Sequence, residues 1–161
     1  DSDWLEIHAT QPHVEKNPPA LRASIPVSLL HRILGATPDS FRQRGIEMGC
    51  DFHKIADRVS GLGISESFDY QSEGTLLTVR KTTRLNAGRA QAVILKFGNA
   101  FGMRFSLLTV SRIAQFISSK MGAFRGKEKE IVEVIQAARN LPTGNYLEAT
   151  DGKQRYEIEL Q

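Results

Sequence analysis

The sequence predicts an α+β fold in which amphipathic helices pack on one face of antiparallel hairpins. Three observations indicate this class. Segments in which apolar and polar residues alternate occur in pairs separated by short turns, as in hairpins. Between these pairs, apolar residues recur at spacings of three and four, as on one face of a helix. The order strand, strand, helix, helix, strand, strand occurs twice along the 161 residues.

The first half begins with two strands and a helix. Alternation over residues 4–9 predicts the first strand, and alternation over residues 21–25 predicts the second. Pro26 ends the second strand, because a proline has no N–H to donate to a central ladder. Apolar residues then recur at helical spacing over residues 27–34, and Gly35 is expected to stop this helix.

Two further helices are predicted next. Thr37-Pro38-Asp39 is a helix start, with threonine as the cap and proline at the first helical position. Gly45 and Gly49 are expected to interrupt this short helix. Asp51 is expected to cap another helix over residues 52–59, which ends at the glycines that follow.

The remaining elements are three hairpins and two helices. The hairpins are predicted over residues 66–80, with its turn at Ser72-Glu73-Gly74, over residues 89–108, with its loop at 98–102, and over residues 146–160, with its turn at Asp151-Gly152. The helices are predicted over residues 110–117, ended by Gly122, and over residues 130–139, ended by Pro142 and Gly144. Because the first two hairpins are consecutive, we expect them to form a four-stranded central meander.

The two halves resemble each other in sequence as well as in element order. Residues 21–25 (LRASI) match residues 103–107 (MRFSL), and Val27-Ser28 matches Val110-Ser111. These matches are compatible with a duplication, although any two α+β halves share some periodicity. We therefore predict an N-terminal half, 1–82, and a C-terminal half, 83–161, packed as one compact domain.

The formal net charge of +3 conceals a strong segregation of charge along the chain. No acidic residue occurs from Gly74 to Lys127, and residues 80–129 hold 11 basic residues and one acidic residue. The flanking segments are acidic, with 7 basic and 11 acidic residues in 1–73 and 3 basic and 6 acidic residues in 130–161. The basic centre predicts an anionic partner, most of all a nucleic acid, whose phosphates basic side chains neutralise.

The candidate nucleic-acid-binding residues lie in this basic centre. They are Arg80, Lys81, Arg84, Arg89, Lys96, Arg104 and Arg112 for phosphates, and Phe101 for stacking on a base. Alternation in the strand predicts that Arg104 faces away from its apolar neighbours. Phe97 and Phe105 are expected in the core, whereas Phe101 lies at a hairpin tip. The alternative is that these cations lie on different faces or pair with the acidic ends of the same chain.

Catalytic and metal-binding residues are not predicted. Cys50-Asp51-Phe52-His53 brings a thiol, a carboxylate and an imidazole together in sequence, but a nucleophile pair needs geometry that adjacency does not provide. We expect Asp51 to cap a helix, Cys50 to be a small buried residue and His53 to be a surface or hydrogen-bonded histidine. The four histidines show no ligand spacing, and the 98–102 loop lacks the residues of a phosphate-binding loop, so no cofactor is predicted.

These observations favour a non-enzymatic domain that binds nucleic acid, DNA or RNA, through its basic centre. The alternative is a protein-interaction or self-assembly module of a larger protein, because an acidic, basic, acidic layout lets the basic segment of one copy meet the acidic end of another. Attachment to anionic membranes ranks third, and an enzyme ranks last. No transmembrane segment is predicted, and the single cysteine and the lack of a signal peptide favour an intracellular location while the compartment stays open.

Overall fold

The protein is an α+β structure built on one eight-stranded antiparallel sheet. A computed structural model describes residues 2–47, 51–72, 74–85, 88–99 and 101–161. The strands are β1 (Ser2–Thr10), β2 (Ala20–Pro26), β3 (Ser67–Ser72), β4 (Thr75–Arg84), β5 (Ala92–Phe97), β6 (Phe101–Ser106), β7 (Gly144–Asp151) and β8 (Gln154–Leu160). The helices of the described residues are α1 (Val27–Ala36), α2 (Asp39–Glu47), α3 (Phe52–Ser60), α4 (Leu107–Lys120) and α5 (Glu128–Ala138), with a short 3-10 helix at Gly122–Phe124.

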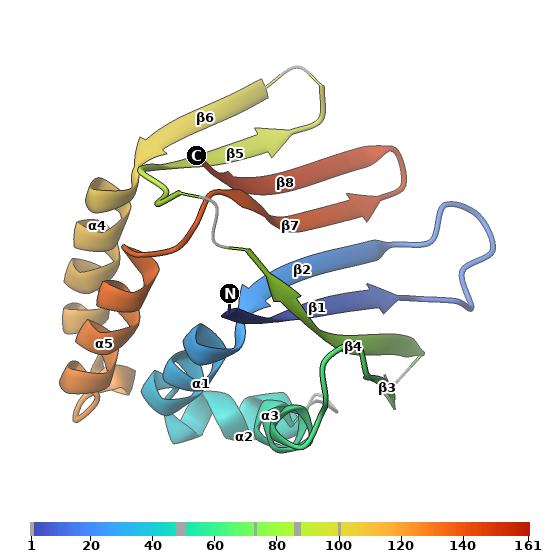
Figure 1. Cartoon of the computed structure of the whole chain (residues 1–161), viewed down its shortest axis with the longest axis horizontal. Coiled ribbons are helices and arrows are strands. Elements are labelled where there is room, and N and C mark those ends of the chain that lie inside the picture. Colours follow the sequence, from blue (N-terminus) through green and yellow to red (C-terminus); the bar gives the residue numbers. More distant parts are fainter. Residues whose placement is uncertain (1, 48–50, 73, 86–87, 100) are drawn as a thin grey trace.

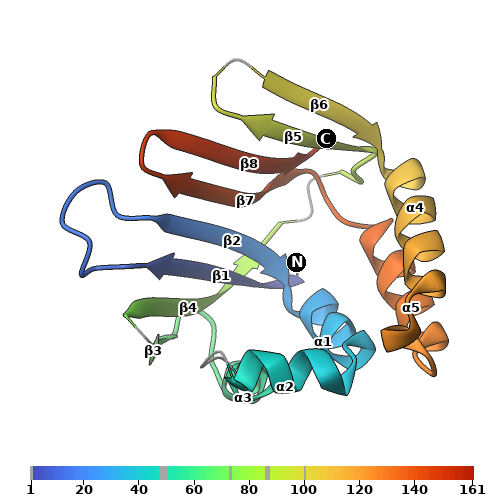
Figure 2. The ribbon, with the colours of Figure 1, turned by 180° about the vertical axis from the view of Figure 1, so that it is seen from behind.

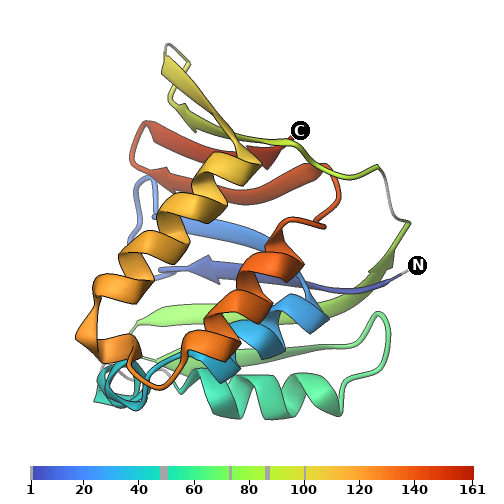
Figure 3. The ribbon, with the colours of Figure 1, turned by 90° about the vertical axis from the view of Figure 1, so that its left-hand side faces the viewer.

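All the helices lie on one side of the sheet (Figures 1 and 3). The strand order is β3-β4-β1-β2-β7-β8-β5-β6, so β3 and β6 form the two edges. Figure 2 shows α4 beginning where β6 ends and running down past α5. The predicted fold class is therefore confirmed.

Local signals explain several element boundaries. The Asp51 carboxylate accepts a hydrogen bond from the His53 N–H at 3.1 Å and so caps α3, as the sequence predicts. Gly74 and Gly152 have φ angles of 81° and 62° in the β3–β4 and β7–β8 turns, a left-handed conformation that favours glycine. The expected cap at Thr37 differs, because its hydroxyl donates to the Ile33 carbonyl at 2.7 Å and so closes α1.

The expected interruption at Gly45 was also wrong. Gly45 lies inside α2, because one glycine weakens a helix without having to end it. The second expected interruption, at Gly49, lies outside the described residues.

The sheet consists of two four-stranded units with the same topology. The first unit has the order β3-β4-β1-β2, and the second has the order β7-β8-β5-β6, so in each unit the final hairpin lies beside the first strand. The units meet where β2 pairs with β7. Each unit's second strand runs directly into a helix, which makes Pro26 equivalent to Ser106, two positions away from the sequence match noted above.

The predicted central meander was wrong. Hairpin β3–β4 lies at one edge of the sheet and hairpin β5–β6 at the other, with β1, β2, β7 and β8 between them. The reason is that β4 pairs with β1 on its free side, and β5 pairs with β8, so each hairpin completes its own unit. The consecutive strands β4 and β5 therefore belong to different units of the sheet.

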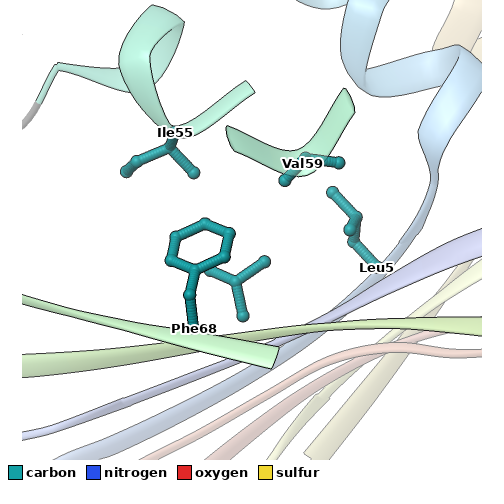
Figure 4. Close-up of a cluster of buried hydrophobic side chains, with 5 residues drawn as sticks. Leu5, Ile55, Val59 and Phe68 are labelled. Atoms are coloured by element: carbon teal, nitrogen blue, oxygen red, sulfur yellow. The ribbon is translucent and has the colours of Figure 1, made fainter. Parts of the chain in front are cut away.

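The main hydrophobic core lies in the first unit, between the sheet and α3. Its buried residues are Leu5, Ile55, Val59, Phe68 and Val79. Figure 4 shows Ile55 and Val59 descending from α3 onto Leu5 and Phe68 of the sheet. The guanidinium of Arg58 lies 4.1 Å from the centre of the Phe68 ring and covers it from the solvent side.

The core of the second unit is smaller. Its buried residues are Ala90, Leu107 and Leu160, with Val93, Leu141 and Tyr146 packed against them. Helix α5, the equivalent of α3, packs mainly on α1, and the main contacts of α4 with the sheet are at β5 and β6. In the described part of the chain, no helix is long and apolar enough to span a bilayer.

Candidate interaction surfaces

Strand register divides the side chains of the sheet between two faces. The helix face carries Leu5, Val79 and Phe68, which pack under α3. Ile7 pairs with Ala23 and Ala23 pairs with Leu147, so this apolar face continues from the first unit into the second. The opposite face, called the open face here, has no helix among the described residues.

Four of the predicted phosphate-binding residues lie on the open face. Arg80 and Arg84 project from β4, Lys96 from β5 and Arg104 from β6, each with the opposite parity to the helix-face residues of its strand, Val79, Leu95 and Met103. The expected orientation of Arg104 is thus confirmed. These four cations belong to both units, however, so they are spread along the width of the sheet.

The other predicted residues lie elsewhere. Lys81 turns to the helix face, where its Nζ donates to the Leu62 carbonyl at 3.1 Å. Arg89 precedes β5, and its Nε donates to the Arg139 carbonyl at 2.8 Å. Arg112 is exposed on α4. Phe101 lies on the helix face of β6, with its ring centre 6.0 Å from that of Phe97. The structure therefore does not bring the eight residues to one surface.

Acidic residues of the same sheet neutralise much of the open face. Arg84 Nη2 lies 3.1 Å from Glu6 Oε1, and Lys96 Nζ lies 2.7 Å from Glu159 Oε2. Arg155 is also on this face, and its Nη2 lies 2.6 Å from Glu157 Oε1. The basic centre of the sequence thus pairs in part with the acidic ends of the chain, as the alternative arrangement of the cations supposes.

The contact between Lys96 and Glu159 changes the ionisation of both groups. The hydrogen bond from Lys96, followed by one from Gln161, lowers the pKa of the Glu159 carboxyl below its ordinary value. The same hydrogen bond to Glu159, together with the attraction of its charge, raises the pKa of Lys96 above its ordinary value. Both side chains are therefore charged at neutral pH and hold each other across β5 and β8.

One concavity on the open face gathers several basic side chains. It has a volume of about 470 Å³, and Arg22, Arg80, Arg84 and His8 contribute to its lining together with Glu6 and Glu148. Arg84 is bound to Glu6, and its guanidinium lies 4.8 Å from the centre of the Trp4 ring. Within the described residues, Arg22 and Arg80 form no ion pair. The sequence prediction missed Arg22 and His8, because both lie outside the basic centre and reach this site only through sheet pairing.

A second surface is apolar and lies at the β6 edge. Three phenylalanines of the β5–β6 hairpin are exposed on the helix face, namely Phe97 (38%), Phe101 (57%) and Phe105 (37%). Three residues of α4, Ile113, Phe116 and Ile117, are also exposed, with 64% of Phe116 accessible to solvent. We call these six residues, which lie on the β5–β6 hairpin and on the helix that follows it, the β6-edge surface.

The β6-edge surface overturns one sequence prediction. Phe97 and Phe105 were expected in the core, and they do occupy the apolar side of their strands. They are exposed because α5 packs mainly on α1. Among the described residues, the buried cluster of the second unit includes Leu107 from the start of α4, whereas α3 contributes Ile55 and Val59 to the core over β3 and β4. The helical stripe on α4 was visible in the sequence, but its spacing does not say what it packs against.

The motif around Cys50 is only partly described. Cys50 itself lies outside the described residues. Asp51 serves as the cap of α3, and within the described residues the buried Nδ1 of His53 has no hydrogen-bond partner. Among the described residues, no three histidine, cysteine, aspartate or glutamate side chains lie together so that they could hold one metal ion.

Comparisons with known proteins add no relative. No protein-family model matches the chain, and neither a curated protein nor a solved structure matches it.

Proposed function

We propose that this chain is a non-enzymatic interaction module that associates with protein, including copies of itself, through the β6-edge surface. The observation that carries the proposal is the exposure of Ile113, Phe116 and Ile117 on α4 together with that of three phenylalanines on the β5–β6 hairpin, whose strand β6 is an edge of the sheet. An apolar cluster beside an open strand offers both apolar area and free backbone groups to a partner. The open face supports this assignment indirectly, because its ion pairs weaken the case for a purely electrostatic partner.

Substitution of Phe116 tests the proposal. Phe116→Glu places a charge in the exposed apolar stripe and is expected to reduce concentration-dependent association, measured by sedimentation velocity. Leu85→Glu is the matched control, because Leu85 is 82% exposed and lies outside the β6-edge surface. A chain that stays monomeric at every concentration, or a Phe116→Glu variant that associates like the unsubstituted chain, would contradict the proposal.

Nucleic-acid binding is the second candidate function. The specific observation in its favour is the concavity that holds Arg22 and Arg80 without ion-pair partners among the described residues. An Arg80→Glu variant is then expected to lose affinity for DNA or RNA, and affinity is expected to fall as salt rises. Lys153→Glu removes an exposed cation from the β7–β8 turn and serves as the control. Equal affinity in the two variants would remove this candidate.

A further inference from the structure

The joint between the two units shows how a third unit could be added. Inside the chain, β2 ends the first unit and pairs antiparallel with β7, which begins the second. The equivalent of β2 in the second unit is β6, and the equivalent of β7 in the first unit is β3. Among the described strands, these two are the ones paired on one side only.

Each equivalence rests on the ends of the strands. Pro26 and Ser106 both precede the first residue of a helix, which makes Ala23 equivalent to Met103 and Leu21 to Phe101. Ser72 and Asp151 both form the last pair before a hairpin turn, with Thr75 and Gln154 respectively. Phe68 is therefore equivalent to Leu147, Asp69 to Glu148 and Tyr70 to Ala149.

We propose that copies of this chain associate head to tail, with β6 of one copy pairing antiparallel with β3 of the next and extending the sheet across the molecules. This inference rests on the proposed function and names the partner as a second copy. The register of the internal joint supports it, because that joint pairs Leu21 with Ala149, Arg22 with Glu148 and Ala23 with Leu147. The contact between copies repeats a contact that the chain already makes within itself.

Transferred to the two edges, this register joins compatible side chains. On the helix face it places Phe101 opposite Tyr70 and Met103 opposite Phe68 of the second copy, which are aromatic and sulfur–aromatic pairs. On the open face it places Gly102 opposite Asp69, so Arg104 lies diagonally beside that carboxylate. The pairing opposes no like charges, and it joins a strand of the basic centre to a strand of the acidic N-terminal segment.

The helices support the same arrangement. In the chain, α5 packs against α1, and Leu29 and Ala36 of α1 are buried. The position of Ala36 corresponds to Phe116 on α4, which is 64% exposed. A second copy docked through β3 would place its α3 beside α4, as α5 lies beside α1. The exposed stripe on α4 would then be covered.

The association is heterologous, since it joins two different edges. A heterologous contact leaves one free β3 edge and one free β6 edge on every oligomer, so growth continues unless a ring closes. The expected species are therefore a series of oligomers whose size rises with concentration. A two-fold pairing of β6 with β6 would instead stop at a dimer.

Site-specific crosslinking of the full chain tests the pairing. On a Cys50→Ser background, Gly102→Cys and Asp69→Cys are made in separate chains, one of which carries a mass tag. At Gly102 a side chain would meet only the Leu95 carbonyl, at 3.6 Å, which is an ordinary contact. With a short thiol–thiol crosslinker, the mixture is expected to give the heterodimer, whereas each variant alone gives little product. A mixture of Gly102→Cys with Lys153→Cys is the matched control and is expected to give none.

The outcomes separate this inference from the proposed function. Association without crosslinking in the Gly102→Cys and Asp69→Cys mixture, or equal crosslinking of Gly102→Cys alone, overturns the head-to-tail pairing while the self-association stands. A chain that is monomeric at all concentrations overturns both. Thermal melts of each cysteine variant verify that it is folded, and Phe116→Glu is expected to weaken assembly about tenfold.

Discussion

Leu5 occupies the centre of the main core, where β1 meets α3. Its side chain is completely buried and packs with Val59, Phe68 and Val79. Leu5→Ala removes apolar contacts and leaves a cavity, so we expect a loss of about 2–5 kcal/mol in the free energy of unfolding. Urea denaturation measures this loss in the free energy of unfolding. Leu85→Ala, at an exposed position, is expected to change stability by no more than about 0.5 kcal/mol. Equal losses in both variants would show that Leu5 is not part of a packed core.

The pair formed by Lys96 and Glu159 predicts a pH effect. A carboxyl whose pKa is lowered by folding stabilises the folded state above its ordinary pKa, and this contribution is lost as pH falls through the lowered value. A lysine whose pKa is raised by folding stabilises the folded state below its ordinary pKa, and this stabilisation is lost as pH rises through the raised value. Lys96→Met is therefore expected to raise the pKa of Glu159 toward its ordinary value.

An NMR titration of the Glu159 side-chain carboxyl measures this pKa directly. Arg112→Met is the control, because Arg112 lies on α4, outside this pair. An unchanged Glu159 pKa in Lys96→Met would show that the Lys96 hydrogen bond does not hold the carboxylate in solution.

The sequence predicted which side of its strand a residue faces better than it predicted whether that residue is buried in the core. Arg104 faces away from Met103 and Phe105, as alternation predicts, because the period of a strand is a local property. Burial of Phe105 depends instead on whether a distant helix covers β6, and that information is not in the strand itself. The same limit applies to Arg22, which lines the same concavity as Arg80 only because β1 pairs with both β2 and β4.

At the scale of single elements, the β3–β4 turn depends on Gly74. Its φ of 81° is a left-handed conformation, and an added Cβ would lie 2.9 Å from Cε1 of His13. Gly74→Ala is expected to destabilise the protein by about 1–2 kcal/mol, because an L-residue at this φ is strained, while the exposed His13 ring can move aside. Gly122→Ala is the matched control, since nothing lies within 4 Å of its Cβ position. Thermal unfolding compares them, and a larger loss in Gly122→Ala would contradict the role of the turn.

Hairpins and helices were predictable from sequence, whereas the order of strands was not. Turn residues such as Asp151-Gly152 define a hairpin within a few residues, so β7 and β8 were found. The joint of β2 with β7 links residues about 130 positions apart, as in the pair Ala20 and Thr150, and no local signal specifies it. Assuming that consecutive hairpins are neighbours led to the wrong meander. The repeated order of elements in the sequence nonetheless indicated the repeated topology.

At the scale of the whole molecule, the two units differ in how firmly they are held. Among the described residues, the core of the first unit has five buried residues between α3 and the sheet, and that of the second has three, with Leu107 as the member from α4. Local opening needs less free energy where fewer apolar contacts are broken. In dilute solution, backbone amides of α4 and β6 are therefore expected to exchange with solvent deuterium faster than those of β1 and β4.

Hydrogen exchange measured over a range of protein concentrations connects this difference to assembly. If β6 of one copy pairs with β3 of another and α4 packs on the second copy's α3, protection of β6, α4 and β3 rises with concentration. Protection of β1 and β8 should stay constant, because both strands already have neighbours on two sides. A rise confined to β6 and α4, with β3 unchanged, would indicate pairing between two β6 edges. A uniform rise across all strands would indicate general stabilisation and would contradict an edge-specific contact.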